Sequence, residues 1–102
     1  MSIPLSIVIP VKNEASNLTA CLESVQDFAD VVVVDSKSTD ATRDIVRKFQ
    51  RTMIDFDWDG KFPKKRNWTL RNHRFQNPWV LFLDADERMT SEVKSELART
   101  LP

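Results

Sequence analysis

The chain has 102 residues and a mass of 11.8 kDa, which leaves room for one domain and excludes a second. Hydrophobic residues make up 41% of the sequence, so we expect a globular domain with a core of its own. Fifteen Lys and Arg balance fifteen Asp and Glu, and the net charge of zero argues against a general binder of nucleic acid or anionic lipid.

The first half of the chain predicts strands that alternate with helices. Ser6 to Val11 is a nearly continuous apolar run and Val31 to Val34 is four valines, which is typical of strands buried on both faces. Asn13 or Ser16 is a candidate N-cap for a helix between them. Its apolar residues follow the i, i+3, i+4, i+7 spacing of one helical stripe: Leu18, Cys21, Leu22 and Val25.

The same pattern then repeats. A second helix begins after a cap at Ser38, Thr39 or Asp40, and a short strand follows at Thr52 to Asp55. The residues of this helix that we expect to face inward are Ala41, Ile45, Val46 and Phe49. Strands that alternate with helices favour parallel pairing.

The second half of the chain has one further strong strand. Phe56 to Pro63 is predicted to be a loop, Lys64 to Arg74 a helix with a weak apolar stripe, and Trp79 to Leu83 a strand. Thr90 is the expected cap of a last helix, whose inward residues are Val93, Leu97 and Leu101. The predicted fold class is therefore α/β, with a mostly parallel sheet flanked by helices.

Polar residues gather where the predicted strands end. Glu14 follows the first strand closely, Asp35 follows the second, and Asp84 and Asp86 follow the strand at Trp79 to Leu83. Because parallel strands end at the same edge of a sheet, we expect these groups to converge there. If the backbone stays extended, Asp84 and Asp86 point the same way and offer carboxylate oxygens to Mg²⁺ or Mn²⁺, with nucleotide phosphates completing the coordination.

Four ordered motifs then carry a family resemblance: Ile7-Val8-Ile9-Pro10-Val11-Lys12-Asn13-Glu14, Val34-Asp35-Ser36-Lys37-Ser38-Thr39-Asp40, Lys65-Arg66-Asn67 and Leu83-Asp84-Ala85-Asp86-Glu87. Together they resemble the Rossmann-like nucleotide-binding half of family 2 glycosyltransferases with the GT-A fold. The Asp-Trp-Asp-Gly insertion at Asp57 to Gly60 resembles the branch of lipopolysaccharide-core glucosyltransferases. The resemblance implies that residues 1–102 form a single nucleotide-sugar-binding domain.

The resemblance also implies roles for individual residues. Pro10 and Glu14 line the nucleoside pocket, and Asp35 accepts a hydrogen bond from uracil. Arg66 approaches the base or the diphosphate, Asp84 meets the ribose, and Asp86 binds the metal that bridges the two phosphates. The implied reaction is inverting transfer of a sugar from a nucleoside diphosphate, such as UDP, to an unidentified sugar or lipid-linked acceptor.

Two positions depart from the family pattern. Lys12 stands where many relatives have an aromatic residue able to stack on the base. Lys37 replaces the usual glycine of an Asp-Ser-Gly-Ser-Thr-Asp motif, where a positive φ costs any residue with a Cβ atom.

Other interpretations stay open. Asp40 is a simple helix cap on the more conservative interpretation, and an isolated Asp-x-Asp is often only a solvated turn. Residues 61–83 contain six Lys or Arg, no acidic residue and several aromatic residues, which is also typical of an RNA-binding surface. A non-catalytic interaction module is the remaining alternative.

The sequence also indicates the setting in which the protein works. We find no secretory signal or membrane-spanning segment and expect a cytoplasmic protein, at most peripheral to the inner face of the membrane. Cys21 is the only cysteine, and we expect it to pack in a helix. Family members continue past the Asp-x-Asp motif into an acceptor-binding half with the catalytic base, so no catalytic residue is assigned here. We expect the 102-residue chain alone to transfer no sugar, and to self-associate through exposed sheet edge or apolar surface.

Overall fold

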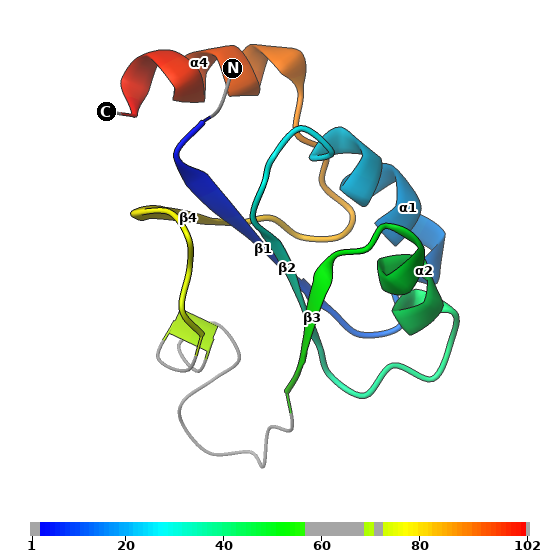
Figure 1. Cartoon of the computed structure of the whole chain (residues 1–102). Helices are drawn as coiled ribbons and strands as arrows, with labels where there is room; N and C mark the ends of the chain where they lie inside the picture. The colour runs from blue at the N-terminus through cyan, green and yellow to red at the C-terminus, as the bar shows by residue number, and fades with distance from the viewer. Residues whose placement is uncertain (1–2, 57–68, 71–72, 102) are drawn as a thin grey trace.

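The computed structural model describes residues 3–56, 69–70 and 73–101. Within them, four strands form a parallel sheet in the order β3-β2-β1-β4 (Figure 1). The elements in chain order are β1 (Leu5–Val11), α1 (Ala15–Ser24), β2 (Val31–Asp35), α2 (Thr42–Lys48), β3 (Thr52–Asp55), β4 (Trp79–Phe82) and α4 (Ser91–Thr100). The predicted α/β class with a mostly parallel, helix-flanked sheet is confirmed.

The two central strands form where the sequence is most uniformly apolar. Four consecutive valines of β2 are buried, and the side chains of β1 alternate between two separate apolar clusters. Ile7, Ile9 and Val33 face the cluster that α1, α2 and α4 cover. Val8, Val32 and Val34 face the other cluster, which Phe56 and Phe75 help to close. Burial on both faces explains why these strands show no alternation of apolar and polar residues.

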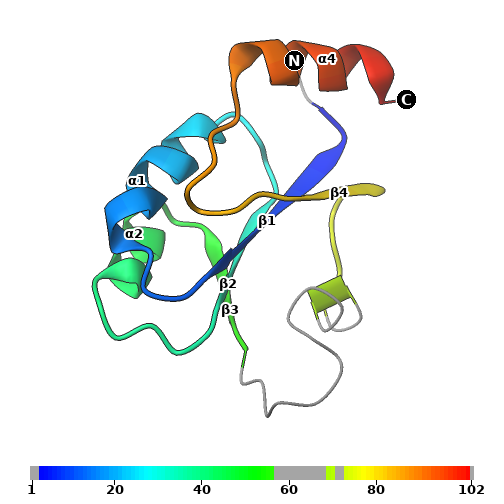
Figure 2. The ribbon, with the colours of Figure 1, turned by 180° about the vertical axis from the view of Figure 1, so that it is seen from behind.

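The helices pack on one face of the sheet. The two views in Figures 1 and 2 place α1 and α2 next to each other and α4 beyond the amino end of β1. The predicted stripe of the first helix is confirmed, since Leu18, Cys21 and Leu22 are all buried. The last helix packs more loosely: Leu97 and Leu101 lie against the core, but no residue of α4 is fully buried.

Two residues expected to face inward do not. Ala41 is the exposed N-cap residue of α2, because that helix begins one residue later than the apolar spacing suggested. Val93 is 45% exposed, because α4 contacts the core mainly through its last two turns. The cap predicted for α4 is confirmed, since the Thr90 hydroxyl accepts a hydrogen bond from the Val93 amide.

Part of the second half lies outside the described residues. This applies to most of the loop predicted for Phe56 to Pro63 and to most of the helix predicted for Lys64 to Arg74. Thr69 and Leu70 are helical, and the His73 amide donates a hydrogen bond to the Thr69 carbonyl. None of the described helices is long and apolar enough to cross a membrane.

A buried polar cluster holds the amino end of β1 against the segment before β4. The Asp30 carboxylate accepts hydrogen bonds from the Ser6 hydroxyl at 2.6 Å and from the Gln76 amide at 3.0 Å. The Asn77 amide donates to the Ser6 oxygen at 3.3 Å. Each buried polar group therefore has a partner, which offsets the cost of removing it from water.

Self-association stays a prediction, and the described sheet shows where it would occur. β4 is an edge strand, and its first residue, Trp79, is 45% exposed. Light scattering at rising concentration is expected to show a dimer or a larger species. Trp79→Lys, which places a charge at that edge, is expected to shift the population toward monomer, whereas a wild-type chain that stays monomeric at high concentration would contradict the prediction.

Candidate functional site at the carboxyl edge of the sheet

The predicted site residues follow strands that all end at one edge of the sheet. The register aligns Val11 of β1 with Asp35 of β2, and Asp35 with Asp55 of β3. Across the sheet, β4 pairs with β1 and continues into Asp84. The parallel topology therefore brings residues that are far apart in sequence to one edge, as expected.

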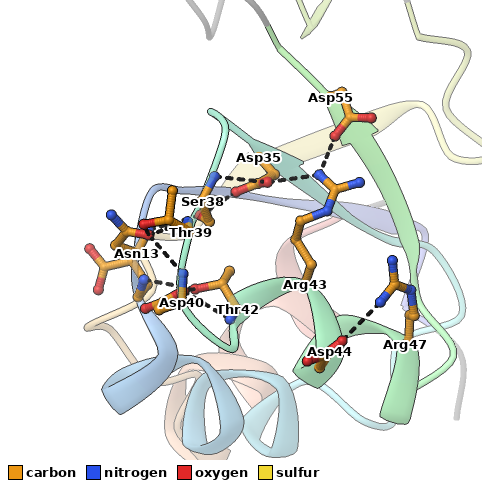
Figure 3. A network of polar contacts seen from close by, with 11 residues as sticks. Asn13, Asp35, Ser38, Thr39, Asp40, Thr42, Arg43, Asp44, Arg47 and Asp55 are labelled. Carbon is orange, nitrogen blue, oxygen red and sulfur yellow. Dashed lines mark hydrogen bonds and ion pairs between the residues drawn. The ribbon is translucent and has the colours of Figure 1, made fainter.

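Asn13 joins the loop after β1 to the loop after β2 (Figure 3). Its side-chain oxygen accepts hydrogen bonds from the backbone amides of Thr39 at 2.7 Å and Asp40 at 3.3 Å. The backbone amide of Asn13 donates a hydrogen bond to the Ser38 hydroxyl at 2.8 Å. Asn13 has φ 52°, a left-handed conformation that asparagine tolerates better than most residues.

Asp40 and Thr42, which follow β2, accept hydrogen bonds from amides at the start of α1. The Asp40 carboxylate accepts from the Ala15 amide at 3.2 Å and from the Thr42 amide at 2.9 Å, while the Thr42 hydroxyl accepts from the Glu14 amide. A hydrogen bond from the Thr42 hydroxyl holds the pKa of Asp40 below its usual value. Asp40 therefore serves amides at the start of both helices, although the N-cap position of α2 belongs to Ala41 and not to Ser38, Thr39 or Asp40 as the sequence suggested.

The N-cap expected from the sequence at α1 is wrong. Glu14, and not Asn13 or Ser16, occupies the N-cap position, and its side chain makes no capping bond. The amides at this helix start find oxygens of Asp40 and Thr42 instead. Long-range contacts between the two loops have replaced the local capping that sequence spacing favours.

Asp35 ends β2 with its side chain fully buried. Its carboxylate accepts hydrogen bonds from the Ser38 amide at 3.2 Å, from the Ser38 hydroxyl, and from the Arg43 guanidinium at 2.9 Å. The Ser38 hydroxyl also accepts a hydrogen bond from the backbone amide of Asn13. The contact between the loops after β1 and β2 therefore also positions Asp35. The exposed fraction of this side chain is 0%, so its neighbours separate the carboxylate from solvent.

Arg43 and Asp55 complete this cluster, and the sequence analysis missed both. One nitrogen of the Arg43 guanidinium contacts both carboxylates, that of Asp35 and that of Asp55. The hydrogen bond from Arg43 lowers the pKa of Asp55, and the bonds to Asp55 and then to Asp35 raise the pKa of Arg43. The available signals were the acidic end of the strand at Thr52 to Asp55 and a basic residue in the first turn of the helix before it.

Glu14 and Pro10 lie on the β1 side of this edge. Pro10 is half-buried within β1 opposite Val34, and Glu14 is half-buried at the start of α1. The Glu14 carboxylate accepts a bond of 3.4 Å from the Asn17 side chain. Arg66 lies outside the described residues, so its predicted approach to the base or diphosphate stays a prediction.

The Asp-x-Asp segment forms a turn, so the condition of an extended backbone, on which a shared direction of Asp84 and Asp86 depended, is not met. The Glu87 amide donates to the Asp84 carbonyl at 2.9 Å, and the Glu87 carboxylate accepts the Asp84 amide at 2.8 Å. Asp84 and Asp86 are exposed on either side of the buried Ala85. Glu87 therefore holds the turn, while the two aspartates face solvent.

Cys21 packs under this turn, as the sequence indicated. It is buried in α1, and its thiol contacts the Asp84 carbonyl at 3.8 Å. Burial raises the pKa of the thiol to about 11, so it stays protonated at neutral pH.

The donor set at the turn suits a hard divalent cation that is shared with a ligand. Among the described residues, no hydrogen bond or ion pair occupies the carboxylate of Asp84 or Asp86, and no group of three or more His, Cys, Asp or Glu could hold a metal. Mg²⁺ and Mn²⁺ sites commonly use one or two carboxylates and complete their coordination with phosphate oxygens and water. The residues present therefore fit such an ion only together with a phosphate ligand.

Lys37 adopts the strained conformation that its position in the motif implied. Its φ is 55°, in the left-handed region where glycine carries no penalty. Lys37→Gly is expected to raise the free energy of unfolding by about 0.5 to 1 kcal/mol, measured by urea denaturation. Lys48→Gly, in the last turn of α2, is the control and is expected to lower it by about 1 kcal/mol. A lower urea midpoint for Lys37→Gly would contradict the argument from backbone strain.

The family-model comparison matches the glycosyl transferase family 2 description over residues 6–101. The chain belongs to glycosyl transferase family 2. It is 32% identical over 107 residues to the lipopolysaccharide core biosynthesis glycosyltransferase LpsC of Rhizobium meliloti, covering 97% of this chain and 37% of LpsC. The family resemblance seen in the four sequence motifs is confirmed.

Two solved structures of one other protein have the same fold. S. aureus TarS 1–349 superimposes with a TM-score of 0.75 and 29% identity, covering 97% of this chain and 32% of that one. The complex of TarS 1–349 with UDP gives a TM-score of 0.69 and 27% identity, covering 94% of this chain and 31% of that one. The chain thus spans about a third of the length of the proteins that it resembles.

Proposed function

We propose that residues 1–102 form one GT-A-type domain that binds a nucleoside-diphosphate sugar, with UDP as the nucleotide, for inverting transfer of the sugar. The observation that carries this proposal is the family 2 match over residues 6–101, together with the likeness to a protein whose structure holds UDP. The same match favours this function over an RNA-binding surface or a non-catalytic interaction module. Neither an acceptor nor a catalytic base is part of this proposal.

Each residue at the carboxyl edge then has a proposed role. Pro10 and Glu14 line the nucleoside pocket, and Asp35 accepts the N–H of the base. Asp84 bonds the ribose, Asp86 binds Mg²⁺ or Mn²⁺, and Arg66 contacts the base or the diphosphate. A cation held by Asp86 would supply positive charge next to the diphosphate that leaves.

Mutual dependence of metal and nucleotide tests this proposal. Two exposed carboxylates form an incomplete cation site, so Mn²⁺ alone is expected to bind weakly and UDP alone is expected to bind weakly. Calorimetry with UDP, CDP, ADP and GDP, each with Mn²⁺ and then with excess chelator, measures both effects. We expect UDP to bind best and its affinity to fall by about tenfold or more in chelator. Equal affinity for UDP with and without the metal would overturn the metal site.

A further inference from the structure

We propose that Glu87 is a positioning residue that shapes the Asp-x-Asp turn through its side-chain oxygen and does not itself bind the cation. This inference rests on the proposed binding of a cation and a nucleotide at the same turn. It adds no ligand to the site and concerns only which residue presents the two aspartates.

Three acidic residues lie within four positions of the turn, but the contacts of Glu87 set it apart from the other two. One carboxylate oxygen of Glu87 accepts a hydrogen bond from the backbone amide of Asp84 at 2.8 Å. Within the described part of the chain, no three His, Cys, Asp or Glu side chains are grouped so that they could hold a metal. Glu87 therefore follows Asp84 and Asp86 in sequence without joining them as a third ligand.

The bond between Asp84 and Glu87 resembles one half of a capping box. In a complete capping box, a Glu or Gln side chain reaches back to the backbone amide three residues earlier, and the side chain of that earlier residue accepts the amide of the Glu or Gln in return. Here the Glu87 amide donates to the backbone carbonyl of Asp84 at 2.9 Å instead. The turn thus closes without using the Asp84 carboxylate, and Asp84 stays exposed.

Both ends of the turn are fixed to the core. The Leu83 amide donates to the Val8 carbonyl at 2.9 Å, and the Met89 amide donates to the Ser24 hydroxyl at 3.0 Å. The side chains of Leu83, Ala85 and Met89 are buried. Because β1 and α1 hold the two ends, the Glu87 bond is left to set the conformation of the exposed residues between them.

The number of carboxylates at the turn determines how it binds a cation. The affinity of a carboxylate site for a divalent cation depends on how many charged ligands it supplies. With Glu87 bonded to the backbone, two carboxylates leave coordination positions for phosphate oxygens and water. Binding of the cation then depends on the nucleotide.

The test compares Glu87→Ala with the conservative variant Glu87→Gln. Glutamine lacks the charge of a good cation ligand, but its side-chain oxygen accepts a backbone amide as glutamate does. The affinity for UDP is measured by calorimetry with Mn²⁺ and with excess chelator, after circular dichroism has confirmed folding. Glu23→Ala, which removes an exposed glutamate from the last turn of α1, is the matched control.

For Glu87→Ala, we expect the affinity for UDP to fall about tenfold with Mn²⁺ and to stay unchanged in chelator. Glu87→Gln is expected to restore most of the lost affinity, and Glu23→Ala is expected to match the wild type. An equal loss in Glu87→Gln and Glu87→Ala would show that Glu87 acts through its charge and would overturn the inference. So would a loss of the same size with and without the metal, or no loss in Glu87→Ala.

Ser24→Ala decides the question if Glu87→Ala does not fold, because it releases the far end of the turn from α1. The Met89 amide then loses its acceptor, and the affinity for UDP is expected to fall about threefold with Mn²⁺ and to stay unchanged in chelator. Ser16→Ala, at an exposed serine of the same helix, is the control. Unchanged Mn²⁺-dependent affinity in Ser24→Ala would overturn the dependence of cation binding on the placement of the turn. If the wild type itself shows no Mn²⁺-dependent binding of UDP, the proposed function fails, and this inference fails with it.

Discussion

Asp86→Asn is expected to lower the Mn²⁺-dependent affinity for UDP by about tenfold to a hundredfold and to leave the fold intact. The asparagine keeps the shape of the side chain but removes the charge that holds a divalent cation between the protein and the diphosphate. Because Asp86 is exposed and makes no hydrogen bond or ion pair with the other described residues, no internal contact is lost. Calorimetry with UDP and Mn²⁺, together with urea denaturation, measures both consequences.

Two variants sharpen this experiment. Asp84→Asn is expected to have a milder effect, since an amide still bonds a ribose hydroxyl. Asp44→Asn removes an equally acidic, exposed residue from α2 and is expected to leave UDP affinity unchanged. If Asp86→Asn binds UDP with the wild-type dependence on Mn²⁺, Asp86 is only a turn residue and the metal assignment is wrong, because asparagine suits a turn well.

Asn13→Ala is expected to reduce both stability and nucleotide binding. The substitution removes the acceptor for the amides of Thr39 and Asp40 and places alanine at φ 52°. We expect the free energy of unfolding to fall by about 2 kcal/mol, of which about half comes from the left-handed backbone. UDP affinity is expected to fall as well, because Asn13 supports the Ser38 hydroxyl that bonds Asp35.

Asn13→Gly and Asn13→Asp separate the two contributions. Glycine removes the strain of the left-handed backbone but still lacks the side-chain oxygen, so about half of the loss in unfolding free energy is expected to remain. Aspartate keeps an acceptor oxygen and tolerates the backbone, so it is expected to stay close to the wild type. Asn17→Ala serves as the control, because the Asn17 side chain makes one long hydrogen bond among the described residues, to the Glu14 carboxylate. Equal stability of Asn13→Ala and the wild type would show that the two loops hold together without this side chain.

Strand positions were predictable from sequence because burial on both faces leaves an unbroken apolar run. Thr52–Asp55 has the predicted bounds, and the other three strands differ from their predictions by one residue at one end. Helices were predictable where one stripe is buried, as at Leu18 and Leu22. The prediction was wrong at Val93, because an apolar residue at the right spacing still stays exposed when its helix contacts the core through other turns.

The sequence also predicts some features of the candidate site and misses others. That Asp35, Asp84 and Asp86 follow buried strands is visible in the sequence, and parallel pairing then requires one shared edge. The roles assigned to Pro10 and Glu14 stay predictions, and so does that of Arg66. The conformation at Asp84 to Glu87 was not predictable, because the Glu87 side chain closes a turn that the alternation of acidic and apolar residues does not reveal.

The sequence by itself determined the α/β class, the strands, the family and the acidic residues at the strand ends, because each leaves a local pattern of burial, charge or motif. Only the tertiary structure decided what those acids contact. Arg43 bridges Asp35 to Asp55 across two strands, and Asn13 reaches amides more than 25 residues away. Such contacts depend on how strand register and loop conformation bring distant atoms within hydrogen-bond distance, and no local spacing of residue types encodes that distance.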